Sequence, residues 1–320
     1  MSRRRTPFVM TVVVLPLALG GCGLGSSIAG IHDAPAEQSG GASVTSGTAT
    51  KVAERVVGDA AEVSRAKADS AARRKVLSGP ALREIEAAAV SKDSAGRTSA
   101  ETEGLEVLAV SRGTDWPRAV LATSRTGDVQ HLHVLVAEKA DRPYTLFADV
   151  PMAAGASVPA LPAVDEGAPV KLSSAPTREV ATAATSWGKA VAFPAPKKAP
   201  QDVSVADGFS TALKKNARAT NKDLGDLADY TQRQAIADGE TVSFELADGG
   251  AITFVSMTRT DTIRATDKLK ELKIEQQALK HVLDASTVKR ALSVKHAETL
   301  ALVTPAEGKA RVVGASEVVE

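Results

Sequence analysis

The sequence predicts an α+β fold in which helices precede antiparallel strands twice along the chain. Apolar residues recur every three to four positions from Lys51 to about Ala68, as on one face of a helix. Four segments between Leu105 and Val150 then alternate apolar and polar residues, as half-buried strands do. The same order returns after residue 201. Helices followed by runs of strands are typical of α+β folds.

The chain opens with a segment typical of a secretory signal peptide. Arg3, Arg4 and Arg5 give it a positive start, and residues 8–19 form an apolar run of twelve, broken only by Thr11 and Pro16. A membrane-spanning helix needs about 20 apolar residues, so this run is too short to cross a bilayer. We therefore expect an export signal rather than a membrane span.

Leu19, Gly20, Gly21 and Cys22 end this segment and resemble the lipobox of bacterial lipoproteins. The resemblance implies that a diacylglyceryl group is attached to the Cys22 thiol, that the chain is cleaved before Cys22, and that the new amino terminus is acylated. Two or more acyl chains anchor a protein stably. We expect residues 1–21 to be the signal peptide, with Leu19, Gly20 and Gly21 recognised during processing. The protein would then be lipid-anchored on the outer face of the cytoplasmic membrane.

The first half of the chain after Cys22 divides into a tether, helices and strands. Residues 22–50 are rich in Gly, Ser, Ala and Thr, which predicts a flexible tether. One helix is expected from residue 51 to about 68, or on toward Leu77, and a second over 81–90 after Gly79-Pro80. Turn signals then separate four expected antiparallel strands, over residues 105–110, 119–124, 130–137 and 144–150.

The second half repeats this order after a Pro-rich stretch. We expect a short helix over 178–192, a helix over 202–219 and an amphipathic helix over 267–284. Asp248-Gly249-Gly250 predicts a hairpin between strands 241–246 and 251–257. Further strands are expected over residues 230–236, 293–303 and 311–319.

These elements predict two similar domains, over residues 51–175 and 201–320, joined by a linker over 176–200. A curved antiparallel sheet around a long amino-terminal helix resembles the cystatin and nuclear transport factor 2 superfamily. Tandem domains of this sort behind a lipobox also resemble uncharacterised actinobacterial lipoproteins. Folds of this kind host both enzymes and non-catalytic modules, so the resemblance does not assign a function.

Charge and cysteine content exclude several classes of protein. The chain has 39 Lys+Arg and 38 Asp+Glu; the signal peptide removes three arginines and no acid, so the chain from Cys22 has 36 basic and 38 acidic residues and a net charge of −2. This balance argues against nucleic-acid binding. A single cysteine excludes a disulfide framework and any zinc site that needs two thiolates.

No catalytic, cofactor or metal residues emerge from the motifs. Ser-x-x-Lys occurs three times, but no Ser-x-Asn element accompanies it, and neither Gly-x-Ser-x-Gly nor a phosphate-binding loop is present. His131 and His133 should share one face of a strand, which we interpret as partly exposed sheet surface, because no third metal ligand is evident.

The sequence therefore predicts a non-catalytic binding or scaffolding protein of the cell envelope. Its partners would be the membrane, through the lipid anchor, and an envelope protein or an apolar ligand. One alternative is a carrier of a lipid or other apolar ligand in a cavity between helix and sheet. A second is an enzyme whose active site is dispersed along the chain, which a deep cleft with two or more buried titratable groups would favour.

Overall fold

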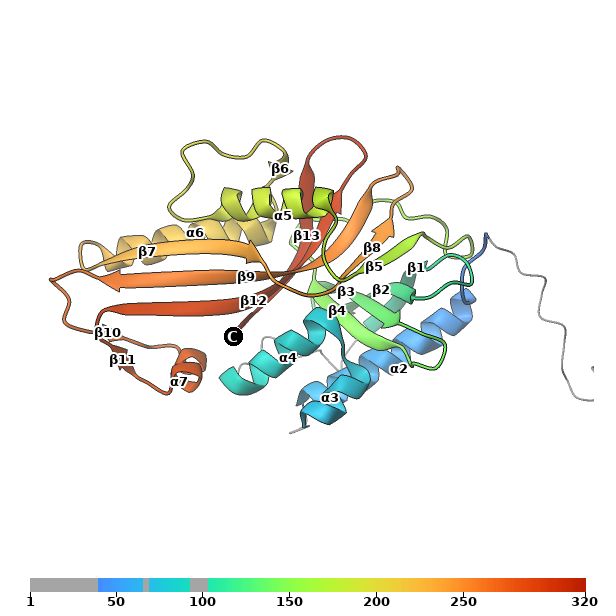
Figure 1. The fold of residues 1–320 in the computed structure, drawn as a ribbon, viewed down its shortest axis with the longest axis horizontal. Coiled ribbons are helices and arrows are strands. Elements are labelled where there is room, and N and C mark those ends of the chain that lie inside the picture. Colours follow the sequence, from blue (N-terminus) through green and yellow to red (C-terminus); the bar gives the residue numbers. More distant parts are fainter. Residues whose placement is uncertain (1–39, 66–68, 93–102) are drawn as a thin grey trace, which may run out of the picture. The chain divides into compact units, whose positions relative to one another are not determined.

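The computed structural model describes residues 40–65, 69–92 and 103–320, which form helices and mainly antiparallel sheets, so the predicted α+β class is confirmed (Figure 1). Ser39–Glu320 is one compact unit. The expected signal peptide and the lipobox residues Leu19, Gly20, Gly21 and Cys22 lie outside the described residues. Among the described residues, no helix has the length and apolar character needed to cross a membrane.

The first sheet is an antiparallel meander in the order β1-β2-β3-β4. Its strands are β1 (Glu103–Val110), β2 (Arg118–Thr126), β3 (Val129–Ala137) and β4 (Thr145–Pro151). The predicted meander is therefore confirmed. Gly127, in the tight turn between β2 and β3, has a φ of 56°, a conformation that glycine adopts without steric cost.

Three helices cover one face of the first sheet. They are α2 (Ser46–Arg65), α3 (Ser70–Val76) and α4 (Gly79–Ser91). Helix α2 packs a stripe of small residues at helical spacing, Ala49, Ala53, Val56 and Ala60, against the buried side chains of this sheet. Small side chains leave little between the helix backbone and the strands, so α2 lies close to the sheet.

The folded region begins earlier than the sequence predicted. Helix α2 starts at Ser46 rather than Lys51, and Ala49 is fully buried because it continues the apolar stripe of the helix. Ala42 forms a β-bridge with Arg112. Residues 40–50, which we expected to belong to the tether, are therefore part of the fold.

The second sheet has the order β5-β8-β9-β12-β13-β6. One edge of the long strand β9 pairs first with β8, at residues 251–254, and then with β7, at residues 257–265. The strands are β5 (Val170–Ser173), β6 (Val203–Ser204), β7 (Ala228–Ile236), β8 (Thr241–Glu245), β9 (Ala251–Ala265), β12 (Ala291–Thr304) and β13 (Ala310–Val319). The predicted hairpin across residues 248–250 is confirmed as β8 and β9.

One face of the second sheet is covered by α5 (Arg178–Val191) and α6 (Gly208–Leu224). Trp187 of α5 is fully buried, and its indole N–H donates to Ser210 Oγ of α6 at 2.8 Å. This hydrogen bond satisfies the one polar atom of the ring. Residues 176–200, expected to be a linker, thus contain a helix that is packed into the core.

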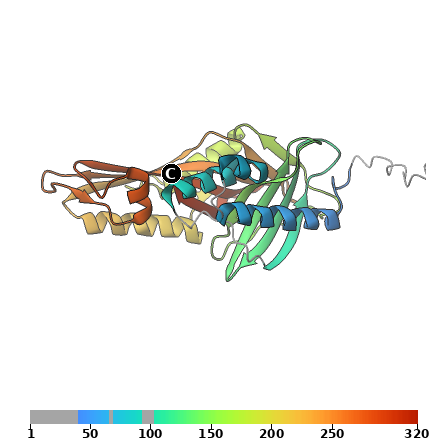
Figure 2. The ribbon, with the colours of Figure 1, turned by 90° about the horizontal axis from the view of Figure 1, so that it is seen from below.

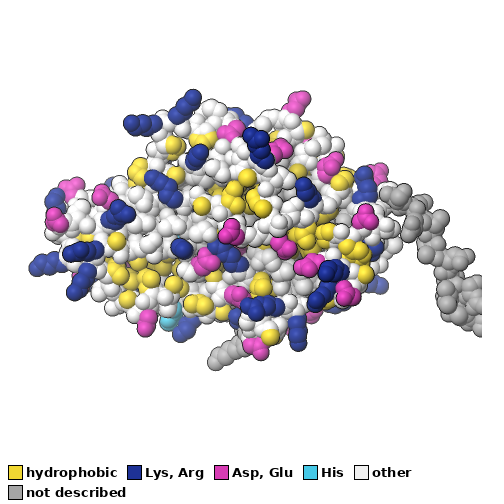
Figure 3. Space-filling model, in the orientation of Figure 1, with side chains coloured by type: hydrophobic (Ala, Val, Ile, Leu, Met, Phe, Trp, Pro, Cys, Tyr) yellow, Lys and Arg dark blue, Asp and Glu magenta, His cyan; other side chains and the backbone are white. Residues whose placement is uncertain are grey.

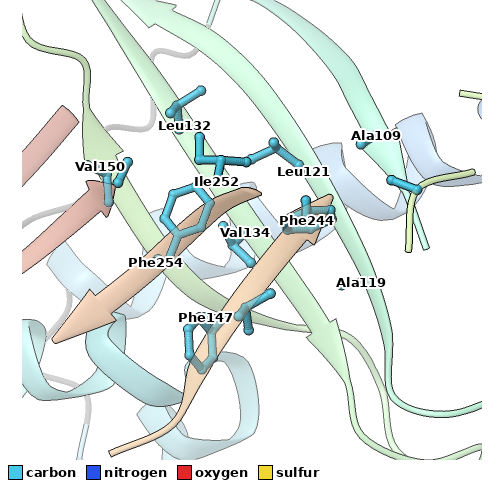
Figure 4. Close-up of a cluster of buried hydrophobic side chains, with 14 of the residues drawn as sticks. Ala109, Ala119, Leu121, Leu132, Val134, Phe147, Val150, Phe244, Ile252 and Phe254 are labelled. Atoms are coloured by element: carbon cyan, nitrogen blue, oxygen red, sulfur yellow. The ribbon is translucent and has the colours of Figure 1, made fainter. Parts of the chain in front are cut away.

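The two sheets bury their remaining faces against each other in a shared core. Figure 4 shows Leu121, Leu132 and Val134 of the first sheet beside Ile252 and Phe254 of the second. Strand β5 comes from the expected first domain, yet it pairs with β8 of the second sheet. The sheets also differ in strand number and order, so the predicted pair of similar domains is not confirmed.

The predicted helix over 267–284 is wrong in its first half. Residues 272–273 form strand β10 (Leu272–Lys273), which pairs with β11 (Thr287–Val288), and only α7 (Gln277–Leu283) is helical. Leu272 and Ile274 are both buried, whereas Lys273 between them is exposed. This alternation has the period of a strand, and it prevails over the leucine spacing on which the prediction was based.

Helix α4 connects the helical layer to the second sheet through hydrogen bonds of Glu84. Glu84 is buried and accepts hydrogen bonds from Thr299 of β12 and from Ser316 of β13, the latter at 2.7 Å. Burial raises the pKa of Glu84 to about 7, although these two hydrogen bonds oppose the shift. The preceding residue, Arg83, pairs with Glu320 at 2.6 Å.

Replacing Glu84 by Gln should weaken the dependence of the unfolding free energy on pH. Because the pKa rises from 4.5 to about 7 on folding, the protonated side chain stabilises the fold fully below about pH 4.5, and this stabilisation is lost as the pH rises through 7. The shift corresponds to on the order of 3 kcal/mol. Urea unfolding should show that, between pH 5 and pH 8.5, the unfolding free energy of the wild type falls by about this much more than that of Glu84→Gln.

The exposed Glu106→Gln variant is the control for this measurement. It should follow the pH profile of the wild type. Parallel profiles for wild type and Glu84→Gln would contradict the assignment of a raised pKa to Glu84.

Candidate functional site

A cleft of about 430 Å³ lies between the second sheet and the helices α6 and α7. We call it the α6–α7 cleft. Figure 2 shows both helices at the same end of the second sheet. One wall is apolar and includes Leu213, Ile263, Leu279, Leu292, Val294 and Val319. The polar lining comes from Asn216, Thr220, Tyr230, Gln232, Arg259, Asp261, Gln276, His296 and Glu317.

The register of β9 and β12 brings apolar and charged side chains together in this cleft. His296 pairs with Arg259, Val294 with Asp261, and Leu292 with Ile263. Alternate residues of a strand point to the same face, so Arg259, Asp261 and Ile263 all face the cleft side of the sheet. The face changes from charged to apolar within four residues of β9.

Arg259 is the centre of a buried ion-pair network, which we call the Arg259 cluster. Its Nε lies 3.2 Å from Asp261 Oδ2, and its Nη1 lies 3.2 Å from Glu298 Oε1 and also donates to Glu317 Oε2. His296 Nε2 is 3.3 Å from Asp261 Oδ2. Three carboxyl groups therefore surround one guanidinium group.

The members of this cluster differ in how readily they ionise. Burial raises the pKa of Glu298 to about 8, even though the charge of Arg259 opposes the shift. Burial also acts to raise the pKa of Asp261, but His296 and Arg259 outweigh it and hold that pKa below its usual value. At neutral pH Glu298 is therefore mostly protonated, whereas Asp261 carries a charge.

Two buried groups in this region, Tyr230 and Glu298, are neutral near pH 7. Burial and the nearby Asp261 charge raise the pKa of Tyr230, so its phenol stays protonated. Glu298 Oε2 is buried and has no hydrogen-bond partner among the described residues. Unpaired buried polar atoms are uncommon and call for an explanation, such as a ligand or an ordered water.

The histidines that the sequence singled out lie in the first sheet, away from this cleft. The rings of His131 and His133 stack at 6.0 Å between centroids, which confirms that they share one face of β3. Asp149 of β4 lies 2.9 Å from His131 Nδ1 and 3.3 Å from His133 Nδ1. Ser124 Oγ of β2 is 2.7 Å from His133 Nε2.

Ser124, His133 and Asp149 are the residue types of a hydrolytic triad, but their burial assigns them a structural role. Ser124 and His133 are each 1% exposed, so a substrate has no access to the hydroxyl group. Asp149 makes its shorter contact with His131 rather than with His133. Burial lowers the pKa of His133, which favours the neutral ring. The expectation of a partly exposed face holds for His131 and is wrong for His133.

The described residues contain no cluster of three or more His, Cys, Asp or Glu side chains that could hold a metal ion.

The two tryptophans of the chain differ in their surroundings. Trp187 is in the core, whereas Trp116 is 38% exposed and lies under the guanidinium of Arg118, 4.5 Å from the ring centroid. On the face drawn in Figure 3, acidic and basic side chains are interspersed.

Replacing Arg259 by Met should destabilise the fold by on the order of 3 kcal/mol, because it leaves buried carboxyl groups without their counter-charge. The loss should shrink towards pH 5, where the carboxyl groups accept protons instead. Thermal or urea unfolding at pH 5 and pH 7.5 would measure both effects. The exposed Arg290→Met variant is the matched control, and equal losses in the two variants would contradict a central role for Arg259.

The chain was compared with models of known protein families, with curated proteins and with solved structures, and none of the three comparisons found a match.

Proposed function

We propose that this chain is a non-catalytic, lipid-anchored binding protein of the cell envelope, and that the α6–α7 cleft holds its ligand. The observation that carries the proposal is the cleft itself, which joins an apolar wall to a buried set of polar groups. Small-molecule sites are typically cavities of about 300 to 1,000 Å³ with mostly apolar walls and a few placed polar groups. The lipobox residues Leu19 to Cys22 support the anchor.

A carrier of a lipid or another apolar ligand is the second candidate. The apolar wall of the cleft favours it, since Leu279, Leu292 and Val294 form part of a buried cluster at this end of the sheet. Catalysis ranks third. The cleft does contain the buried titratable groups Tyr230 and Arg259, the feature expected of a dispersed active site. The burial of Arg259 is accounted for by its ion pairs with Asp261, Glu298 and Glu317, so we rank catalysis below binding.

The anchor is tested by replacing Cys22 with Ala. We expect the wild-type chain to incorporate labelled palmitate and to sediment with membranes, because its acyl chains are buried in the bilayer. The Cys22→Ala variant should lose the label and leave the membrane pellet. A variant that keeps both the label and the membrane association would contradict lipidation at Cys22.

The ligand site is tested by filling the cleft. Thr220 lines it on α6, whereas Lys215 is an exposed residue of the same helix outside the lining. Native mass spectrometry of full-length protein, purified gently from membranes, should detect a bound small molecule in wild type and in Lys215→Trp. Thr220→Trp should reduce its occupancy at least five-fold. Equal occupancy in the two variants would place the ligand elsewhere, and no bound molecule in any of them would count against the proposal.

A further inference from the structure

We infer that the α6–α7 cleft selects an amphiphilic organic cation, with a protonated amine held at Asp261 and Glu317 and an apolar body along the opposite wall. This inference rests on the proposed function, because it names the class of ligand for the same cleft.

The balance of exposed charge at the Arg259 cluster favours a cation. Two carboxylates, Asp261 and Glu317, face one guanidinium group, because the third carboxyl group, Glu298, is mostly protonated at neutral pH. The side chain of Arg259 is only 8% exposed, whereas those of Asp261 and Glu317 are 18% and 41% exposed. The two carboxylate side chains are therefore more exposed than the guanidinium group, and Asp261 Oδ1, which is buried, has no hydrogen-bond partner among the described residues.

The hydrogen-bonding groups beside the Arg259 cluster favour a ligand that donates hydrogen bonds. Gln232 donates its amide Nε2 to Val191 O at 2.9 Å, so the amide oxygen is its remaining hydrogen-bonding group at the cleft. Tyr230 OH lies 3.5 Å from that oxygen, at the limit of a hydrogen bond. A primary ammonium group has three donors and no acceptor, which matches two carboxylates and an amide oxygen.

An anionic ligand fits these groups less well. Two side chains in the lining can carry a positive charge, Arg259 and His296, and both already pair with carboxyl groups. Arg259 pairs with Asp261, Glu298 and Glu317, and His296 pairs with Asp261. A carboxylate or phosphate ligand would have to displace one of these partners and would leave it buried beside the new negative charge. Like charges at such distances in a partly buried site repel strongly.

The apolar wall begins directly beside the acidic groups. Val294 is the cross-strand neighbour of Asp261, and Leu292 and Ile263 form the next pair along the sheet. Leu279 of α7 joins the same buried cluster. A ligand with its amine at Asp261 would therefore place the following carbon atoms against Val294 and Leu292, where their burial is favourable.

Three probes with the same chain length separate the contributions of head group and tail. Isothermal titration of the detergent-free full-length Cys22→Ala chain at pH 7 would compare decylamine, decanol and decanoate, each below its micelle concentration. We expect decylamine to bind at least ten-fold more tightly than the other two. Asp261→Asn and Glu317→Gln should each weaken the binding of decylamine at least five-fold and leave the binding of decanol unchanged. Asp141→Asn, at an exposed carboxylate in the turn between β3 and β4, should change the affinity for neither probe.

The other outcomes overturn the inference in distinguishable ways. Equal binding of the three probes, abolished by Thr220→Trp, would leave the cleft as a ligand site without preference for a cation. Tighter binding of decanoate would make Arg259 the recognition group and reverse the predicted charge. If no probe binds while the native protein still carries a small molecule, the ligand class is wrong and the proposed function stands. If the native protein carries none either, both fail.

Discussion

Each of the two large sheets is apolar over much of both faces, and the rest of the architecture follows from the need to cover these surfaces. In β2 and β3 six consecutive residues are buried, so these strands lack the alternation of a sheet with one wet side. Helices cover one face of each sheet, and the remaining apolar faces pack against each other in a shared core. A half of this chain folded by itself would expose that surface to water, at a cost of about 25 cal/mol per Å².

The sequence was sufficient to predict those elements whose local signals agree with their final surroundings. The meander β1 to β4 and the hairpin β8–β9 were predicted because turn residues separate each pair of strands. Strand β5, over residues 170–173, could not be predicted, because it is short, lies in a Pro-rich stretch and gains its order only by pairing with β8. The error over residues 267–284 arose because Leu272 belongs to both a helical and an alternating pattern, and long-range packing decides between them.

The candidate site was the least predictable part of the molecule. Arg259 and Asp261 look like ordinary polar positions of a strand, and nothing in the sequence around β9 shows that α6 covers that face. Glu298 and Glu317 lie on the neighbouring strands, so the cluster exists only through the registers of β9, β12 and β13. The signal that could have drawn attention to it is Glu298, an acidic residue just before the apolar run over residues 300–303. His131 and His133 were noticed because they are neighbours in sequence, whereas Asp149 needed the register of β4.

The hydrogen bond between Thr299 and Glu84 joins residues that are 215 positions apart in the sequence, and this separation affects how the chain folds. The amino-terminal helices and the meander emerge first during synthesis, but the strands that cover them, β9, β12 and β13, are the last to appear. Until then the inner face of the meander has no partner. Contacts between residues far apart in sequence slow folding. Until its last strands are made, a chain of this topology therefore leaves an apolar sheet face open to solvent, a state that invites aggregation.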